Sequence, residues 1–323
     1  MSGREERLKI LASTLGFTAC GITDLGPSRF PAELDGWLAA GYGGTMRYLH
    51  RQAAKRKEPA RIVAGATRAV VVLDNYAPPP EPLAASDGPA VQVAKYARGA
   101  DYHDVTQERL AHLAEWLLAE GATIARPYAD AGPVPERELA QRAGLGWIGK
   151  NTMLLRPGSG SLFFIGTVLT DLDLAVDAPF DLDHCGTCTR CLDACPTEAF
   201  VGPHILDATR CISYLTIEQK GPIPGEFVPL ADGWAFGCDI CNDVCPWNER
   251  FAEPTGVSAF LPRPVPDRTD PDYFERMDEV EFARRFADSP LSRPGLAGMQ
   301  RNWRAAFDSR EKGEVGSEKK PTG

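Results

Sequence analysis

Eight of the nine cysteines lie between Cys185 and Cys245. The run CGTCTRCLDACP places four of them at the spacing CxxCxxCxxxCP, and CDICNDVCP supplies three more with the same ending. In bacterial ferredoxins, three thiolates of such a run bind one 4Fe-4S cluster and the fourth binds the neighbouring cluster. The second run lacks its leading cysteine, and Cys211 is the only candidate to supply it. The pattern therefore predicts two 4Fe-4S clusters.

The ferredoxin spacing also predicts which four cysteines bind each of the two clusters. Zinc ribbons use CxxC pairs too, but they show neither a third cysteine at the next two-residue step nor a CP ending. A disulfide framework would need an oxidising compartment, and the charged start MSGREERLKILASTLG does not resemble a signal peptide. One cluster is expected to bind Cys185, Cys188, Cys191 and Cys245, and the other Cys195, Cys211, Cys238 and Cys241.

Length and composition predict a globular protein of two main units. The chain has 323 residues, of which 43% are hydrophobic and 24% charged. No apolar run approaches the roughly 18 residues of a membrane span, so we expect a cytoplasmic protein that does not bind membranes. A net charge of −9 argues against indiscriminate binding to nucleic acid, because that affinity comes mainly from Lys and Arg.

Hydrophobic periodicity places strands between helices over residues 17–170, which predicts an α/β or α+β catalytic domain. Asp101 is the expected N-cap of a helix that ends at Gly121. Strands are expected over 17–25, 68–77, 91–99, 122–130 and 160–170, and helices over 4–16, 32–40, 136–143, 277–288 and 296–308. We predict a catalytic domain over 1–175, a ferredoxin-like domain over 176–252, a short helical segment over 253–308 and a disordered tail over 309–323.

The cluster domain implies a site that uses its electrons. The run GLGWIG (144–149) has the GxGxxG spacing, but it follows a predicted helix and not a strand, so it is not the turn of a dinucleotide-binding fold. The chain has no GxxxxGK[ST] loop and no CxxCH haem motif, so nicotinamide, ATP and c-type haem are disfavoured. The segment DAGPVPERELAQRAGLGWIGKNTMLL, residues 130–155, instead gathers glycines around a short helix. Such turns let the backbone approach a ligand closely.

Several segments together resemble the epoxyqueuosine reductase family, cobalamin-dependent iron–sulfur enzymes of tRNA modification. They are KYARGADYHDV (95–105), the glycine-rich segment 130–155, GSLFFIGTVLT (160–170), the two cysteine runs, and RCISYLT (210–216). The resemblance implies a base-off cobalamin between the catalytic domain and one cluster. In this family the clusters reduce the cofactor to cob(I)alamin, which attacks the epoxide of epoxyqueuosine in the tRNA anticodon loop and leads to queuosine.

The resemblance also implies roles for individual residues. Asp130 matches the proton donor, and we expect its apolar neighbours Ala131, Gly132, Pro133 and Val134 to desolvate it and raise its pKa. The alternative for Asp130 is a helix cap or a turn. The positions that match cobalamin contacts are Arg56, Ala94, Asp130, Leu154, Ile165, Ser213, Cys238 and Asp239.

The tRNA partner would be held by other residues. Tyr102 and His103, at the start of a predicted helix, could face the substrate. The candidates for contacts with tRNA phosphates are Arg47, Arg51, Lys55, Lys220, Arg301 and Arg304. Recognition of the anticodon loop should flip the modified base into a pocket. We also expect an electron donor, whose identity the residues do not indicate, and a monomer.

Two other classes of protein share the cysteine pattern. A reductive dehalogenase-like corrinoid enzyme has cobalamin and two clusters, but it usually carries a twin-arginine signal, which this start lacks. A plain iron–sulfur electron carrier explains the cysteines and leaves the segment 130–155 without a purpose. Many epoxyqueuosine reductases also continue into a helical-repeat extension, of which GLAGMQRNWRAAFDS resembles only the beginning.

Overall fold

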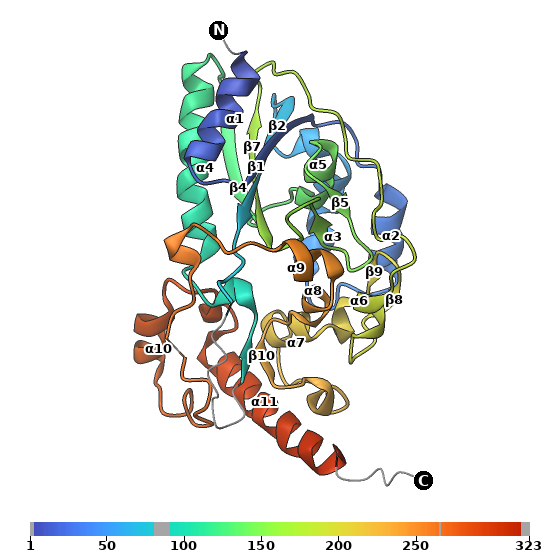
Figure 1. The fold of residues 1–323 in the computed structure, drawn as a ribbon, viewed down its shortest axis with the longest axis vertical. Helices are drawn as coiled ribbons and strands as arrows, with labels where there is room; N and C mark the ends of the chain where they lie inside the picture. The colour runs from blue at the N-terminus through green and yellow to red at the C-terminus, as the bar shows by residue number, and fades with distance from the viewer. Residues whose placement is uncertain (1–2, 81–90, 265, 318–323) are drawn as a thin grey trace.

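The computed structural model describes residues 3–80, 91–264 and 266–317. Its N-terminal part is built on a four-stranded sheet with the order β1-β2-β7-β4 (Figure 1). All three strand pairs are antiparallel, so this domain is α+β. The strands are β1 (Ala19–Asp24), β2 (Arg68–Asn75), β7 (Phe163–Thr170) and β4 (Ala125–Ala129).

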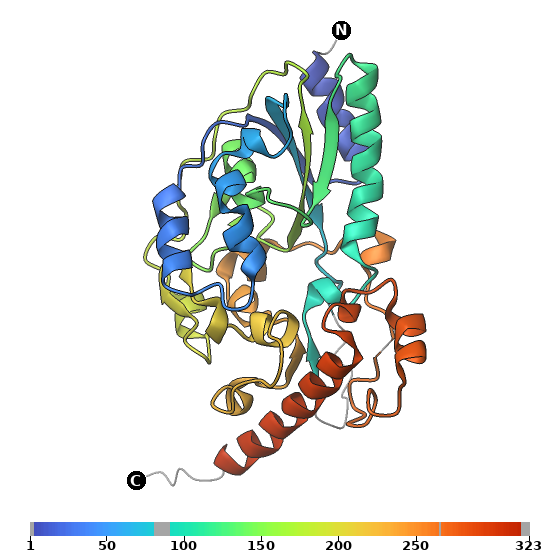
Figure 2. The same ribbon diagram turned by 180° about the vertical axis from the view of Figure 1, so that it is seen from behind.

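Both faces of the sheet are covered by helices (Figures 1 and 2). Alternate residues of β2 point to opposite faces, as the two-residue period of a strand requires. Val70 and Val72 pack with α1 (Arg4–Thr14) and α4 (Tyr102–Ala119). Val71 and Leu73 pack on the other face with α5 (Glu136–Arg142). The sheet is thus the middle layer of three.

The remaining elements of the N-terminal part lie on the α5 side of the sheet. They are α2 (Pro31–Ala39), α3 (Arg47–Lys57), η1 (Pro59–Arg61) and the small hairpin of β5 (Trp147–Ile148) and β6 (Leu154–Leu155). On the opposite side, the predicted N-cap of α4 is confirmed, because the Asp101 side chain accepts a hydrogen bond from the His103 backbone N–H at 3.0 Å.

The cysteine-rich part has two short helices, and each contains the last cysteine of a CxxC pair. Cys191 lies in α6 (Arg190–Asp193) and Cys241 lies in α8 (Ile240–Asp243), and these two helices contact each other. The other elements are β8 (Phe200–Gly202), β9 (Ile205–Leu206), η3 (Ala208–Arg210), α7 (Ile212–Ile217), η4 (Val228–Leu230) and α9 (Pro246–Phe251).

The strand predicted over 91–99 is wrong in its extent and its surroundings. Only β3 (Gln92–Val93) is extended, and η2 (Lys95–Ala97) follows it. β3 pairs in parallel with β10 (Trp234–Phe236), outside the main sheet. Its Val93 is buried with residues of the C-terminal helices. This segment therefore joins the N-terminal domain to the rest of the chain.

The C-terminal part packs as a helical layer beneath β3 and β10 (Figure 2). This layer consists of α10 (Glu279–Phe286), η6 (Pro290–Ser292) and α11 (Gly295–Ser317). Phe260 of η5 (Ser258–Phe260) packs instead with Tyr102 and Phe164, at the start of α4 and on β7. The predicted start of a disordered tail at residue 309 is wrong, since α11 continues past it. The buried Ser309 hydroxyl accepts a hydrogen bond from the Gly233 N–H at 3.0 Å. Residues 318–323 of that predicted tail lie outside the described residues.

Across residues 3–80, 91–264 and 266–317, none of the helices combines the length and apolar character needed to span a bilayer.

Candidate active site

Asp130 follows the last residue of β4, at the end of the sheet that faces the cysteine-rich part. Its backbone has a left-handed φ of 54°, uncommon for a residue other than glycine. The Tyr102 hydroxyl donates a hydrogen bond to Asp130 Oδ2 at 2.5 Å, and His103 Nε2 lies 3.7 Å from the same oxygen. The structure therefore brings together three residues that the sequence predicted for the site.

A second carboxylate orients the histidine. His103 Nδ1 lies 2.7 Å from Asp101 Oδ1, and this hydrogen bond raises the pKa of His103, as do the charges of Asp101 and Asp130. Burial and the nearby Asp130 raise the pKa of Tyr102, so this side chain keeps its proton and acts as a donor. Asp130 thus lies beside two groups that can hold protons.

The turn after Asp130 is fixed at both ends by residues outside it. The Asp130 N–H donates to Glu136 Oε1 at 2.8 Å. Arg56 donates from Nη2 to the Gly132 carbonyl at 3.1 Å and from Nη1 to the Val134 carbonyl at 3.2 Å. Gly132 has φ 152°, and a Cβ there would come within 2.8 Å of the Tyr128 ring. Glycine is therefore required at this position.

The sequence did not single out Glu136 or Arg293. Burial, followed by the negative charge of Asp130, raises the pKa of Glu136 to about 8. An acid in the first turn of a helix is usually a solvated partner of the helix dipole, so local sequence gave no sign of this environment. Arg293 pairs with Glu218 at 2.6 Å. Although burial opposes it, the charge of Glu218, followed by that of Asp130, raises the pKa of Arg293.

The predicted desolvation of Asp130 by its own turn is wrong. Its side chain is 54% exposed, so Ala131, Gly132, Pro133 and Val134 do not exclude water from the carboxyl. The apolar residue of the turn that is buried is Val134, which packs beneath it with α5. Any further desolvation of Asp130 must come from molecules that bind at the site.

The residues that match cobalamin contacts form two groups. Leu154 and Ile165 pack in the same cluster as Val134, beside the Asp130 turn. Ala94 is buried against Ile212, with Cys238 beside it. Ser213 follows Ile212 in α7. Tyr96 lies between the two groups. The centroid of its ring is 6.0 Å from that of Tyr102, and its side chain also packs against the cluster that contains Ala94.

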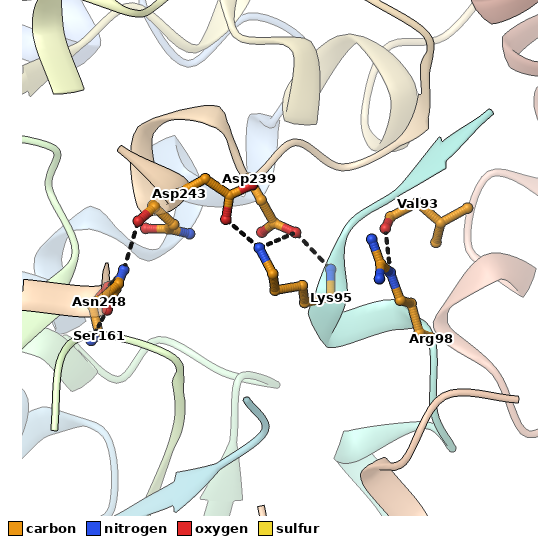
Figure 3. Close-up of polar contacts among 8 residues, drawn as sticks. Val93, Lys95, Arg98, Ser161, Asp239, Asp243 and Asn248 are labelled. Carbon is orange, nitrogen blue, oxygen red and sulfur yellow. Dashed lines mark hydrogen bonds and ion pairs between the residues drawn. The ribbon is translucent and has the colours of Figure 1, made fainter. Parts of the chain in front are cut away.

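Asp239 belongs to the second group and is tied to the Ala94 segment (Figure 3). Its side chain is buried and accepts a hydrogen bond from the Lys95 backbone N–H at 2.7 Å. The Lys95 ammonium lies 4.0 Å from Asp239 and pairs with Asp243. A second buried contact is the hydrogen bond from the Ser161 N–H to Asn248 Oδ1 at 2.6 Å. This bond and the one between Lys95 and Asp239 both link the cysteine-rich part to the catalytic domain.

The cysteines fall into two groups by their electrostatic neighbours. Burial raises the pKa of Cys191, and Cys185, Cys245 and Cys188 raise it further. Burial also raises the pKa of Cys238, where the contributing cysteines are Cys211 and Cys195. At Cys241 burial is again the largest cause, and Cys238 and Cys211 contribute more than Cys191. Cys185 also accepts a hydrogen bond from Trp147 Nε1 at 3.5 Å.

No three His, Cys, Asp or Glu side chains converge on one point that could hold a single ion, within the ranges that the structure describes. A 4Fe-4S cube takes one thiolate at each iron, so its ligands surround the cube and do not share one ion.

The predicted tRNA-contacting residues differ in their availability. Arg47, Arg51 and Lys55 are exposed at four-residue intervals along α3, and none pairs with an acid in the described part of the chain. Lys220 is exposed in a separate loop. Arg304 pairs with Glu275 at 2.7 Å. The Arg301 guanidinium instead donates hydrogen bonds to the backbone carbonyls of Leu215, Gln219 and Gly221. These bonds connect α11 to α7 and the loop that follows it.

Comparison with known proteins matches both halves of this arrangement. The family described as "4Fe-4S double cluster binding domain" matches residues 184–248, and the one described as "Epoxyqueuosine reductase QueG, DUF1730" matches residues 56–131. An epoxyqueuosine reductase of Pseudomonas aeruginosa is 45% identical over 300 residues, which cover 92% of this chain and 83% of the relative. The chain belongs to the epoxyqueuosine reductase family.

Solved structures of epoxyqueuosine reductases show the same fold. One, crystallised with a tRNA-Tyr epoxyqueuosine-modified stem loop, has a TM-score of 0.86 and 29% identity over 96% of this chain and 82% of its own. The Bacillus subtilis enzyme with its catalytic aspartate loop swung out of the active site has a TM-score of 0.83 and 28% identity over 97% of this chain and 83% of its own. As an epoxyqueuosine reductase family member, the chain is an oxidoreductase with a double 4Fe-4S domain.

Proposed function

We propose that this chain reduces epoxyqueuosine to queuosine in the tRNA anticodon loop, with Asp130 as the proton donor. The observation that carries the proposal is the placement of Asp130 beside Tyr102 and His103 at the end of the sheet that faces the cysteine-rich part. The relative solved with a tRNA-Tyr epoxyqueuosine-modified stem loop supports the assignment of the substrate. The family assignment disfavours the two alternatives, a reductive dehalogenase-like enzyme and a plain electron carrier.

The residues present fit the cofactors that the proposal requires. The two electrostatic groups of thiols agree with one cluster held by Cys185, Cys188, Cys191 and Cys245 and another held by Cys195, Cys211, Cys238 and Cys241. Arg56 Nε is buried and has no hydrogen-bond partner among the described residues, so it can bind an acceptor from a cobalamin. Ala94, Leu154, Ile165, Ser213, Cys238 and Asp239 would hold that cofactor with Arg56. When bound and reduced through the clusters, cobalamin supplies the nucleophile that opens the epoxide.

The protein supplies protons to the oxygen of the substrate. The overall change consumes two electrons and two protons: the epoxide oxygen leaves as water, and a carbon–carbon double bond forms. Asp130 donates a proton to the alkoxide that ring opening produces. His103, oriented by Asp101, lies 3.7 Å from Asp130 and can return a proton to it before the hydroxyl leaves. Tyr102 keeps the carboxyl in place by its hydrogen bond.

The exposed basic row of α3 suits the phosphates of the anticodon stem loop. Arg47, Arg51 and Lys55 share one face of the helix whose Arg56 holds the Asp130 turn. Phosphates bound along this face would lie near the catalytic residues. We include Lys220 as a further contact, and we leave out Arg301 because backbone carbonyls already occupy its guanidinium.

The test is an Asp130→Asn variant, purified without oxygen and loaded with clusters and cobalamin. We expect the corrin and iron–sulfur absorption bands to match those of the wild type, because the amide has nearly the same volume as the carboxyl it replaces. Formation of queuosine should fall by at least about 100-fold, since loss of a general acid typically costs 10²–10⁴. Turnover close to the wild-type rate would rule out Asp130 as the proton donor.

A further inference from the structure

The Asp130 turn is held by few contacts, and its conformation is unfavourable. A left-handed φ of 54° at Asp130 persists only when the surroundings impose it. Within the turn, the Ala131 N–H donates to the Ala129 carbonyl at 2.6 Å. From outside it, Arg56 donates to the carbonyls of Gly132 and Val134, and Glu136 accepts from the Asp130 N–H.

The contact made by Glu136 has a specific geometric consequence. Its Oε1 binds the backbone N–H of the catalytic residue itself, at 2.8 Å. The acceptor therefore fixes the peptide plane that precedes the Asp130 Cα, and with it the direction of the carboxyl. In that direction, the carboxyl meets Tyr102 at 2.5 Å and His103 at 3.7 Å. Among the described residues, Glu136 is the one group outside the turn that hydrogen-bonds to the Asp130 backbone.

Glu136 reaches this position from the first turn of α5, which is anchored independently. Glu138, two residues on, accepts hydrogen bonds from the Ser28 hydroxyl and the Arg29 N–H, both at 2.6 Å. Leu139 and Ala140 are fully buried under the sheet. The helix is thus a rigid support, and the Glu136 side chain spans from it to the turn.

We propose that Glu136 is a positioning residue for Asp130: its carboxyl oxygen is the acceptor that keeps the catalytic turn in the conformation facing Tyr102 and His103. This inference rests on the proposed role of Asp130. The Bacillus subtilis relative, with its catalytic aspartate loop swung out, is an example of a family member in which such a loop adopts another position. In this chain the loop faces inward, and the Glu136 contact accompanies that position.

The test uses three substitutions at Glu136 in the enzyme loaded with clusters and cobalamin. Glu136→Ala removes the acceptor. Glu136→Asp keeps a carboxyl but withdraws the acceptor by one methylene. Glu136→Gln replaces the carboxyl with an amide, whose oxygen can still accept from the Asp130 N–H. Glu115→Ala is the control, because Glu115 is 75% exposed on α4.

We expect the Ala and Asp variants to lower kcat for an epoxyqueuosine stem loop by about 10- to 100-fold, the range that small misplacements of a catalytic group produce. The KM should change less than about twofold, because substrate binding does not use Glu136. Hydrogen exchange in peptides covering residues 129–135 should become faster in both variants. The Gln variant and the control should keep the wild-type kcat and exchange rates.

Three results would overturn the proposal. They are wild-type kcat in Glu136→Ala and Glu136→Asp, a Glu136→Gln variant as slow as Glu136→Ala, or unchanged exchange over 129–135 in a slow variant. If Glu136→Ala does not fold, Glu136→Asp and Glu136→Gln still separate the acceptor from the carboxyl group that carries it. Asp130→Asn measured in parallel separates the two proposals. An inactive Asp130→Asn with a fully active Glu136→Ala would contradict only the role of Glu136.

Discussion

Glu136 also has a property that can be measured without catalysis. Burial and the charge of Asp130 raise its pKa to about 8, from the 4.5 of an exposed glutamate. Between these two values the folded protein holds a proton that the unfolded chain has released. The folded state therefore loses stability relative to the unfolded chain as the pH rises from about 4.5 to 8, and the loss is complete above that range.

We predict that Glu136→Gln removes this pH dependence, because an amide does not titrate. The melting temperature of the variant minus that of the wild type should increase in favour of the variant from about pH 5 to about pH 8, and then level off. Anaerobic thermal melts of cluster-loaded protein at several pH values measure this difference. Parallel curves for the two proteins over that range would show that Glu136 is not protonated in the folded state.

Single residues differ in how far the sequence alone could place them. The family resemblance named Asp130 and Arg56, and spacing named the cysteines. The residues next to Glu136 and Arg293 in the sequence do not indicate their roles. The environment of Glu136 depends on the unusual turn at Asp130, and that of Arg293 depends on Glu218, which is far away in the sequence. The residue types around Asp130 likewise show neither its exposed carboxyl nor its left-handed backbone.

At the scale of elements, α11 shows how a basic residue can be misjudged. Arg301 was a candidate for phosphate contact, yet Nη1 donates to the Gln219 carbonyl at 2.9 Å and Nη2 donates to the Leu215 carbonyl at 3.1 Å. These bonds attach α11 to α7 and the loop that follows it. Arg304, almost one turn later, forms an ion pair with Glu275, and its side chain is 65% exposed.

We predict that Arg301→Ala destabilises the protein by about 1–3 kcal/mol, because it leaves partly buried carbonyls without a charged donor. Arg304→Ala is the matched control and should cost about 0–1 kcal/mol, as exposed ion pairs do. Anaerobic melting temperatures of the two variants give the comparison. Arg301→Ala should leave the salt dependence of tRNA binding unchanged, and a smaller salt slope in that variant would restore Arg301 as a phosphate contact.

Hydrophobic periodicity and capping residues predicted the helices and strands whose formation depends on nearby residues. The helix capped by Asp101 and the strands at 68–77 and 160–170 agree with α4, β2 and β7 within a few residues. The segment 91–99 did not, because its partner β10 lies far away in sequence, within the cysteine-rich part. The helix of residues 309–317 was missed because that stretch has few apolar residues and continues a helix whose buried side lies earlier.

The whole molecule joins a catalytic domain to a cluster domain through buried polar contacts. Lys95 with Asp239, and Ser161 with Asn248, fix the second cysteine run against the segments that hold Ala94 and β7 (Figure 3). These contacts hold the second cysteine run against the catalytic domain, which the proposed electron transfer to the active site would require. The cytoplasmic location, the monomeric state and the electron donor stay predictions from the sequence.

The most direct test of the proposed activity is conversion of a tRNA stem loop that carries epoxyqueuosine. Reduced, cluster-loaded enzyme is mixed with this stem loop with and without cobalamin, and the nucleosides are separated and identified by mass. We predict that queuosine forms only when cobalamin is present, with one water lost for each two electrons consumed. Queuosine formation at the same rate without cobalamin would contradict the account, as would no conversion by enzyme whose spectrum shows both clusters and the bound corrin.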